Sequence, residues 1–320
     1  MREFLEFEKP IAQIEDKIES LRTYSKGNPK ALEEIKRLEA KSRELQKELL
    51  AKLTPWQQTQ IARHPQRPTT LDYVGYLIQD FVELHGDRTF GDDHAVVAGL
   101  GTFQGRPVTI VGHQKGKTVR DRIYRNFGMP SPEGFRKALR VMGLAERFSK
   151  PVLSFIDTPG AYPGMGAEER GQAEAIAKNL MVMSRLPVPI LVVVIGEGQS
   201  GGALGLAVGD RLLMQEHAIF SVLSPEGCAA ILWEDATKAP EAAAALKMTA
   251  RDLKNLGVID EIIPEPLGGA HRDFERAAQA VGQAIQTHLA ALQSIPIEAL
   301  LEKRYARYRK MGVFAEGEKS

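Results

Sequence analysis

Residues 190–210 read ILVVVIGEGQSGGALGLAVGD, an apolar run that passes directly into a turn rich in glycine. A short, continuous apolar run ended by a turn signal is consistent with a buried strand of a parallel sheet, and we expect a short helix after the turn. This order places the turn at the carboxyl end of a strand, where α/β proteins bind their ligands.

The same alternation continues on both sides of this stretch. Residues 151–157 and 218–223 predict further buried strands, and a helix is expected over about 167–186. Residues 224–226 (SPE) predict the start of another helix, and residues 258–263 a last strand. Continuous apolar strands separated by helices favour a parallel sheet that is covered on both faces.

Upstream of residue 150 the pattern is different. Residues 95–103 and 107–112 are rich in strand-forming residues and flank the turn QGR (104–106), which predicts a β-hairpin. Another helix is predicted from about Leu71 to Leu84, with its end near Gly86.

The first fifty residues predict a helical hairpin. Two apolar stripes at helical spacing are separated by Gly27-Asn28-Pro29, and Thr54-Pro55-Trp56-Gln57 predicts the capped start of the next helix. The stripes consist of Ile11, Ile14, Ile18 and Leu21, and of Leu32, Ile35, Leu38, Leu45 and Leu49. Each stripe must pack either on this chain or on another subunit, and the sequence leaves both open.

Composition excludes several classes of protein. The 320 residues contain 42 basic and 41 acidic side chains, so a formal net charge of +1 gives no global attraction to nucleic acid or membrane. The single cysteine, Cys228, excludes an internal disulfide and a cysteine-based zinc site within this chain. The charged N-terminus does not resemble a signal peptide, and no apolar run reaches membrane-spanning length. We therefore expect a cytoplasmic protein.

Ser200 raises the question of a nucleophile. Residues 198–202 (GQSGG) fit the G-x-S-x-G elbow of hydrolases, and His217, His271 and His288 follow later in the chain. The alternative is that the backbone of the turn is the working part. Glycine turns at 160–164 and 196–202 each follow a predicted strand and precede a helix, so their amides can form an oxyanion hole. A simple packing turn would have the same spacing, and spacing alone does not choose.

Two further patterns concern phosphate binding. Residues 112–118 (GHQKGKT) resemble a P-loop but have three residues between the glycines where four are needed, which argues against a nucleotide hydrolase. Residues 113–125 carry Lys115, Lys117 and three arginines with one acid. This basic stretch is either a solvated loop or an anion-binding patch for a phosphorylated cofactor such as coenzyme A, or for an acidic partner.

Seven stretches of the chain resemble the alpha subunit of the bacterial acetyl-coenzyme A carboxylase carboxyltransferase. They are RHPQRPTTLDYV (63–74), GHQKGK (112–117), RNFGMPSPEGFRKALR (125–140), FIDTPGAYPGMGAEERGQAEAIA (155–177), GEGQSGGAL (196–204), SPEGCAAILW (224–233) and GVIDEIIPEPLGGAH (257–271). The resemblance implies an α/β fold of the crotonase-like (ClpP/crotonase) type, a spiral of β-β-α units with an N-terminal helical hairpin. We accordingly expect a hairpin at 1–53, a carboxyltransferase domain at 54–295 and a helical tail at 296–320.

The resemblance also implies an activity and partners. The family transfers the carboxyl group from carboxybiotin on a carrier protein to acetyl-CoA and forms malonyl-CoA, the first committed step of fatty acid synthesis, within an ATP-binding enzyme. It implies a beta subunit that binds acetyl-CoA and carries a zinc module, an α2β2 assembly, a biotin carboxyl carrier protein and a biotin carboxylase. No metal is expected in this chain.

The resemblance finally implies roles for residues of the glycine turns. Biotin can act as its own base, so the protein supplies positioning and amide donors rather than a nucleophile. The amides of Gly201 and Gly202, with Ala203 adjoining, are expected to face the biotin oxygen. Gly160 and Ala161 are expected to line the same pocket, and Lys115 and Lys117 to contact substrate. The family often has glycine where this chain has Gln199, which matters only if that position needs a positive φ.

Three functions remain open from the sequence. They are a carboxyltransferase subunit, a serine hydrolase that uses Ser200, and a non-catalytic scaffold that docks the biotin carrier.

Overall fold

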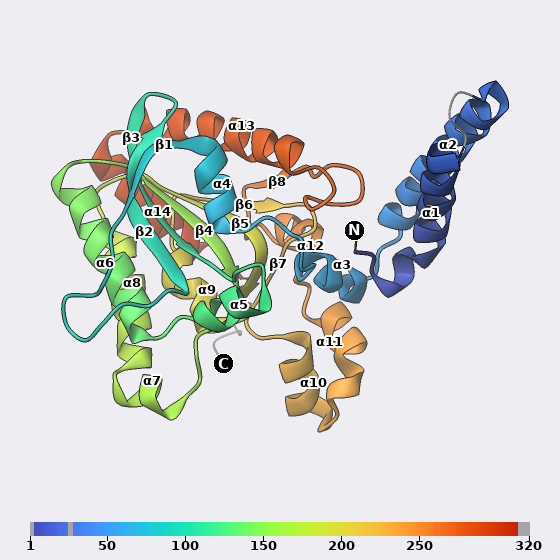
Figure 1. Ribbon diagram of the computed structural model, residues 1–320. Coiled ribbons are helices and arrows are strands. Elements are labelled where there is room, and N and C mark those ends of the chain that lie inside the picture. The colour runs from blue at the N-terminus through green and yellow to red at the C-terminus, as the bar shows by residue number, and fades with distance from the viewer. Residues whose placement is uncertain (1–2, 25–27, 313–320) are drawn as a thin grey trace, which may run out of the picture.

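One mixed sheet organises the chain. Within residues 3–24 and 28–312, which the computed structural model describes, eight strands form this sheet in the order β1-β2-β3-β4-β5-β6-β8, with β7 paired to the end of β5 (Figure 1). The strands are β1 (Ile78–Glu83), β2 (Val96–Phe103), β3 (Arg106–His113), β4 (Val152–Thr158), β5 (Ile190–Gln199), β6 (Arg211–Gln215), β7 (Ile219–Ser221) and β8 (Glu261–Ile263).

The direction of the strands changes at β3. β1, β2 and β3 pair antiparallel, and β2 joins β3 through Gln104 and Gly105, whose φ values of 48° and 77° form the mirror-image turn that suits a two-residue hairpin. From β3 to β8 the neighbouring strands are parallel. The predicted hairpin is therefore confirmed, and the parallel sheet is confirmed for the part that begins at β3.

Helices cover both faces of the sheet, as the continuous apolar strands predict. On one face α4 and α13 pack with Phe155, Leu191 and Val193; on the other α6, α8 and α9 pack with Ile156, Val192 and Val194. All ten residues of β5 are buried, so the strand that ends at the glycine turn lies in the middle of the core. The helices of the body are α3 (Pro55–Ala62), α4 (Thr70–Leu77), α5 (Val119–Tyr124), α6 (Pro132–Arg147), α7 (Met165–Glu169), α8 (Gln172–Arg185), α9 (Ser200–Ala207), α10 (Pro225–Trp233), α11 (Ala239–Ala245), α12 (Ala250–Asn255) and α13 (Phe274–Gln293), with short 3-10 turns at Asn126–Gly128 and Ala236–Lys238.

Four predicted elements are wrong in extent. The helix predicted over 71–84 ends at Leu77, because the following residues pair with β2 as strand β1. The helix predicted over 167–186 is divided into α7 and α8 at Gly171, whose φ of 82° interrupts a right-handed helix. The strands predicted over 218–223 and 258–263 are only the three-residue β7 and β8, and β6 was not predicted.

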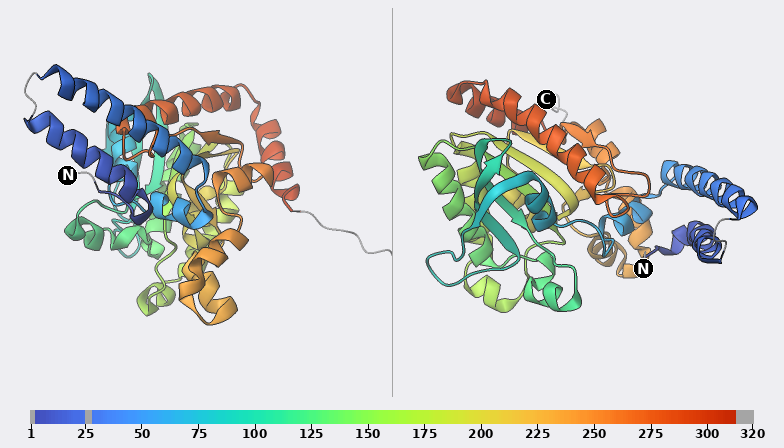
Figure 2. Two further views of the ribbon diagram at one scale, coloured as in Figure 1. Left: turned by 90° about the vertical axis from the view of Figure 1, so that its right-hand side faces the viewer. Right: turned by 45° about the horizontal axis from the view of Figure 1, so that its top comes forward.

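The N-terminal hairpin projects from the body of the molecule (Figures 1 and 2). Its helices are α1 (Lys9–Tyr24) and α2 (Pro29–Ala51), preceded by a 3-10 turn at Glu6–Glu8. Ile18, Ile35 and Leu38 are buried between the two helices, so the predicted stripes pack largely on each other. Asn28 caps α2 by accepting a hydrogen bond from the Lys30 amide, whereas the predicted break at Gly27 lies outside the described residues.

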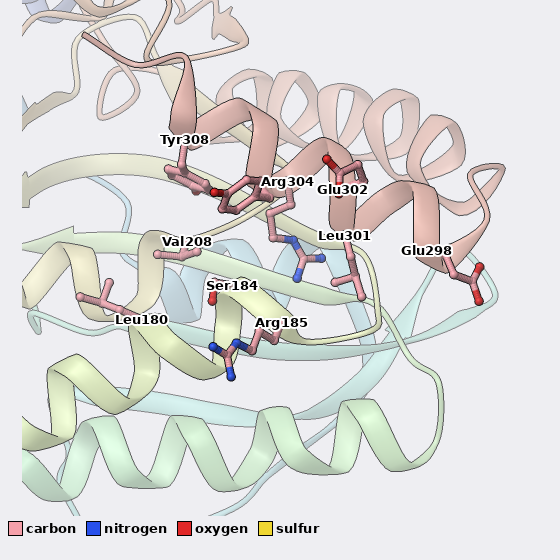
Figure 3. A pocket seen from close by; sticks show the side chains of 10 residues that line it. Leu180, Ser184, Arg185, Val208, Glu298, Leu301, Glu302, Arg304 and Tyr308 are labelled. Carbon is pink, nitrogen blue, oxygen red and sulfur yellow. The ribbon is translucent and has the colours of Figure 1, made fainter.

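The C-terminal helix α14 (Ile297–Arg309) is held by one buried arginine. Arg304 forms an ion pair with Asp210 at 2.7 Å and donates to three backbone carbonyls near the end of α8. A cavity of about 570 Å³ lies beside it between α8 and α14 (Figure 3). None of the helices within the described ranges combines the length and the apolar character needed to cross a bilayer.

Candidate functional site

The glycine turn lies where β5 passes directly into α9. Gln199 has φ −121° and ψ 142°, an extended conformation that any residue adopts, so a glycine is not needed there. The positive φ belongs instead to Ser200, at 57°. The side chain of Gln199, which precedes α9, does not accept a hydrogen bond from the helix. The amides of the first turn therefore have no side-chain cap, and by helix geometry they also lack a carbonyl partner four residues back. These amides include those of Gly201 and Gly202.

Gly202 brings the two predicted glycine turns into contact. A Cβ built on Gly202 would lie 2.4 Å from the carbonyl carbon of Gly160 and 2.5 Å from the amide nitrogen of Ala161, closer than side chains approach backbone. Gly160 itself has φ 142° and is held by the hydroxyl of Thr158, which accepts from its amide at 3.0 Å. The loop after β4 and the start of α9 therefore form one rigid backbone unit.

His113 joins this unit to strand β3. Its Nε2 lies 3.1 Å from the carbonyl oxygen of Gly202, and its Nδ1 accepts from the amide of Asp157 at 3.4 Å. Nε2 must therefore carry the proton and donate it to Gly202. Burial lowers the pKa of His113 to about 3, because the imidazolium would lose its hydration, so the ring is neutral.

A buried ionic cluster lies at the ends of β3, β4 and β5. Lys115 forms ion pairs with Asp157 and Glu197, and Arg63 pairs with Glu197 and Glu226. Burial would raise the pKa of Glu197, but Lys115 and Arg63 outweigh it and hold the pKa below its usual range. Burial likewise would lower the pKa of Lys115, but the two carboxylates raise it above its usual value. The cluster borders a cavity of about 260 Å³.

The two candidate lysines occupy different surroundings. Lys115 is mostly buried within the ionic cluster, whereas Lys117 is 57% exposed and pairs with Asp72 at 2.6 Å. The structure thus places Lys115 beside the strand ends that carry the glycine turns and leaves Lys117 at the surface. Their contact with substrate stays a prediction.

The Ser200 hydroxyl lacks the partners of a nucleophile. Among the described residues, no histidine or carboxylate forms a hydrogen bond with it. His113 is committed to Gly202 and Asp157, and His271 stacks on His64 with ring centroids 3.8 Å apart. A serine nucleophile needs a base within hydrogen-bond reach, and the described residues do not supply one.

Among the described residues, Glu8, His64 and His271 form one group that could hold a metal ion, since their ligand atoms lie within 4.8 Å of one another. His64 Nδ1 already accepts from the amide of Gln66 at 3.1 Å, and Glu8 pairs with Arg272 at 3.0 Å. These contacts compete with metal binding. We interpret the group as the link between the N-terminal segment and the body.

The cavity of Figure 3 belongs to the other end of α9. Val208, the residue that ends α9, lines it together with α8 and α14, whereas Gly202 lies in the first turn of α9. The candidate site is therefore the backbone unit around Gly202, with His113 and the ionic cluster beside it. The sequence pattern singled out the glycines and Lys115 but missed His113, Arg63 and Glu197. His113 and Glu197 lie at or near the ends of buried strands, which was the available signal, whereas Arg63 directly follows helix α3 and no strand pattern indicates it.

Comparisons with known proteins agree on one family. A sequence model described as "Acetyl co-enzyme A carboxylase carboxyltransferase-like" matches residues 4–312. The acetyl-coenzyme A carboxylase carboxyl transferase subunit alpha of Geobacter metallireducens is 57% identical over 312 residues, covering 98% of each chain. The protein of the same name from Nitrosomonas europaea is 59% identical over 314 residues, covering 97% of each chain.

Solved structures confirm the crotonase-like fold. A transcarboxylase 12S structure with methylmalonyl-coenzyme A bound matches with a TM-score of 0.55 and 20% identity, over 79% of this chain and 44% of that one. The beta subunit of geranyl-CoA carboxylase from P. aeruginosa matches with a TM-score of 0.55 and 16% identity, over 83% and 48%. At this identity the likeness concerns the fold. From the sequence relatives and the family match together, the chain belongs to the acetyl-coenzyme A carboxylase carboxyltransferase family, as an alpha subunit.

Proposed function

We propose that this chain, together with a beta subunit, transfers the carboxyl group of carboxybiotin on a carrier protein to acetyl-CoA, giving malonyl-CoA for fatty acid synthesis. The observation that carries the proposal is membership of the family over residues 4–312, with relatives named carboxyl transferase subunit alpha that match over 97% or 98% of their own length.

The glycine turn fits the chemistry of this reaction. Bound carboxybiotin would supply the carboxyl group and a ureido oxygen on which negative charge grows as that group leaves. The amides of Gly201 and Gly202, with Ala203 adjoining, would donate hydrogen bonds to this oxygen. Backbone donors fixed before the reaction need no reorganisation, and losing one such donor costs about 2.7–4 kcal/mol of barrier.

The surrounding residues would keep these donors in place. Gly160 and Ala161 hold Gly202 from one side, and glycine at 202 is required by their contact. The buried ionic cluster joins the ends of β3, β4 and β5, so it would fix the strands that present the turns. Lys115 and Lys117 would add positive charge for the phosphates of coenzyme A or for an acidic carrier.

The remaining parts of the assembly are also proposals. We assign the oxyanion hole for the thioester oxygen, and the zinc module, to the beta subunit in an α2β2 complex. The projecting hairpin formed by α1 and α2 would contact a neighbouring subunit. A biotin carboxyl carrier protein and a biotin carboxylase would complete the enzyme. We assign ATP binding to no residue of this chain. ATP binding by the complete enzyme and the cytoplasmic location both stay predictions from the sequence.

Co-expression with a beta subunit tests the proposal. Purified complex is assayed for carboxyl transfer in the reverse direction, from malonyl-CoA to free biotin, with each subunit omitted in turn. We expect activity only when both subunits are present. Activity of the beta subunit alone, with this chain adding only carrier binding, would support the scaffold function instead, and an inactive complex would overturn the proposal.

A further inference from the structure

We propose that His113 is the positioning residue of the glycine turn: its hydrogen bond to the Gly202 carbonyl fixes the direction of the backbone donors at the start of α9. The inference rests on the proposed function, because it concerns the donors that serve carboxyl transfer. It assigns to the histidine of GHQKGK (112–117) a role that it would perform without touching substrate.

Three buried side chains donate hydrogen bonds to carbonyls of α9. Asn179 donates to Gly205 at 3.0 Å and Ser154 donates to Leu206 at 2.6 Å. These two carbonyls lie at the C-terminal end of the eight-residue helix, where no partner exists four residues later within the helix. Asn179 and Ser154 therefore satisfy carbonyls that would otherwise be buried without a partner.

The bond from His113 differs from the other two. Gly202 lies in the first turn, so its carbonyl already has the amide of Leu206, four residues later, as its helical partner. The hydrogen bond from His113 is an additional one, at 3.1 Å. Since it is not needed to satisfy the carbonyl, its consequence is to orient the peptide.

Orientation matters here because two glycines are consecutive. Glycine has more backbone freedom than any other residue, so Gly201 and Gly202 alone would define the direction of their amides poorly. A peptide unit is planar, so a donor that holds the Gly202 carbonyl fixes the whole peptide between Gly202 and Ala203, whose amide has the Gln199 carbonyl four residues back as its helical partner. It limits rotation at Gly202 as well, while Gly160 and Ala161 block the opposite side.

The histidine is itself held rigidly. It is completely buried, and its second nitrogen accepts from the amide of Asp157, whose carboxylate in turn accepts from the amide of Glu197 at 3.0 Å and from Lys115. One connected set of hydrogen bonds thus runs from the ends of β3, β4 and β5 to the first turn of α9.

The test compares His113→Leu, His113→Gln and the matched control Ser154→Ala in the α–β complex. Ser154→Ala removes a buried donor from the other end of the same helix. Steady-state kinetics use malonyl-CoA and free biotin. We expect His113→Leu to lower kcat by ~10- to 100-fold, because misplacing backbone donors by a fraction of an ångström to 1 Å weakens catalysis on this scale. The KM for malonyl-CoA should stay near the wild-type value.

The two other variants separate positioning from folding. His113→Gln can place its amide nitrogen near Nε2, so it should recover most of kcat, and Ser154→Ala should lower the unfolding midpoint with kcat little changed. If His113→Leu does not fold, His113→Asn takes its place, because the shorter amide side chain does not reach the carbonyl of Gly202. In that case, equal kcat for the His113→Gln and His113→Asn variants would overturn the inference. Equal kcat for His113→Leu and Ser154→Ala in an active complex would also overturn it. An inactive wild-type complex would instead overturn the proposed function.

Discussion

Lys115 Nζ lies 2.9 Å from Oδ1 of Asp157 and also contacts Glu197, so one ammonium bridges the carboxylates at the ends of β4 and β5. The same Asp157 oxygen accepts from the amide of Glu197 at 3.0 Å. Both acids are buried. Together with Arg63, this lysine holds the pKa of the buried Glu197 below its usual range, although burial alone would raise it.

Removal of this ammonium should destabilise the fold. In Lys115→Met, Asp157 would lose its ion-pair partner and Glu197 would keep only Arg63, and breaking a buried ion pair in this way costs about 3–5 kcal/mol. Lys117→Met is the matched control, because its pair with Asp72 is exposed and contributes only ~0–1 kcal/mol. Urea unfolding of both variants gives the comparison. Equal midpoints for the two would contradict a structural role of Lys115.

Lys117 tests the predicted substrate contact. If the basic stretch faces the phosphates of coenzyme A, Lys117→Met should raise the KM for malonyl-CoA by about two- to five-fold, the size of one exposed charge contact, with kcat unchanged. The exposed Lys36 of α2, changed to Met, is the control for loss of one surface charge. An identical KM in wild type, Lys117→Met and Lys36→Met would show that Lys117 does not contact the substrate.

Ser200 should be dispensable as a hydroxyl. Ser200→Ala is expected to keep carboxyl transfer within about an order of magnitude of wild type, since the backbone of the turn provides the donors. Ser200→Gly should be at least as stable as wild type, because φ 57° costs a non-glycine residue roughly 1 kcal/mol. The checks are kinetics of the α–β complex and reaction with a fluorophosphonate probe. Labelling of Ser200, together with complete loss of transfer in Ser200→Ala, would contradict this account.

The buried His113 and the half-buried His271 should make stability depend on pH. Burial lowers the pKa of His113 to about 3 and that of His271 to about 2, whereas in the unfolded chain both titrate near 6.5. The unfolded state therefore binds more protons between these values, and stability rises as pH rises toward 6.5. From pH 6.5 down to pH 5, each histidine should contribute a loss of about 1–2 kcal/mol.

His113→Gln should flatten this dependence. Asp93 acts in the opposite direction, because burial raises its pKa to about 6 and its contribution falls as pH rises from about 4 to 6. The informative quantity is thus the difference in the free energy of unfolding between wild type and His113→Gln, measured by urea unfolding at pH 5, 6 and 7. A constant difference across this range would contradict a neutral, proton-excluding His113.

The sequence predicted the part of the fold that depends on local patterns. Buried strands β4 and β5, the hairpin of β2 and β3, and the capping box at Thr54 follow from apolar runs, a turn signal and a cap, and all are confirmed. Strand β1 was predicted as helix, because only its pairing with β2 decides its conformation. The break at Gly171 was missed because an isolated glycine in a helical pattern is compatible with a continuous helix and with a helix end.

The site was predictable where backbone chemistry is visible in residue types. Consecutive glycines after a buried strand indicated the turn, and the family resemblance indicated its role. The remaining contacts of the site join segments that are far apart in the sequence. Gly160 and Gly202 are 42 residues apart, and Arg63 and Glu197 are 134 residues apart. The hydrogen bond from His113 to Gly202 is of the same long-range kind. No local pattern encodes contacts at such separations.

Kinetics of Gly202→Ala beside Gly201→Ala test the central claim most directly. Both variants keep their amide protons, and neither glycine has a positive φ. A Cβ at 202 would lie 2.4 Å from the backbone of Gly160. A Cβ at 201 would meet only the side chain of Ile176, with Cδ1 nearest at 3.3 Å. The account predicts an assembled α–β complex in both, with kcat for carboxyl transfer lowered by ~10²-fold in Gly202→Ala and nearly wild type in Gly201→Ala. Wild-type kcat in an assembled Gly202→Ala complex would contradict the claim that the backbone of this turn stabilises the transition state.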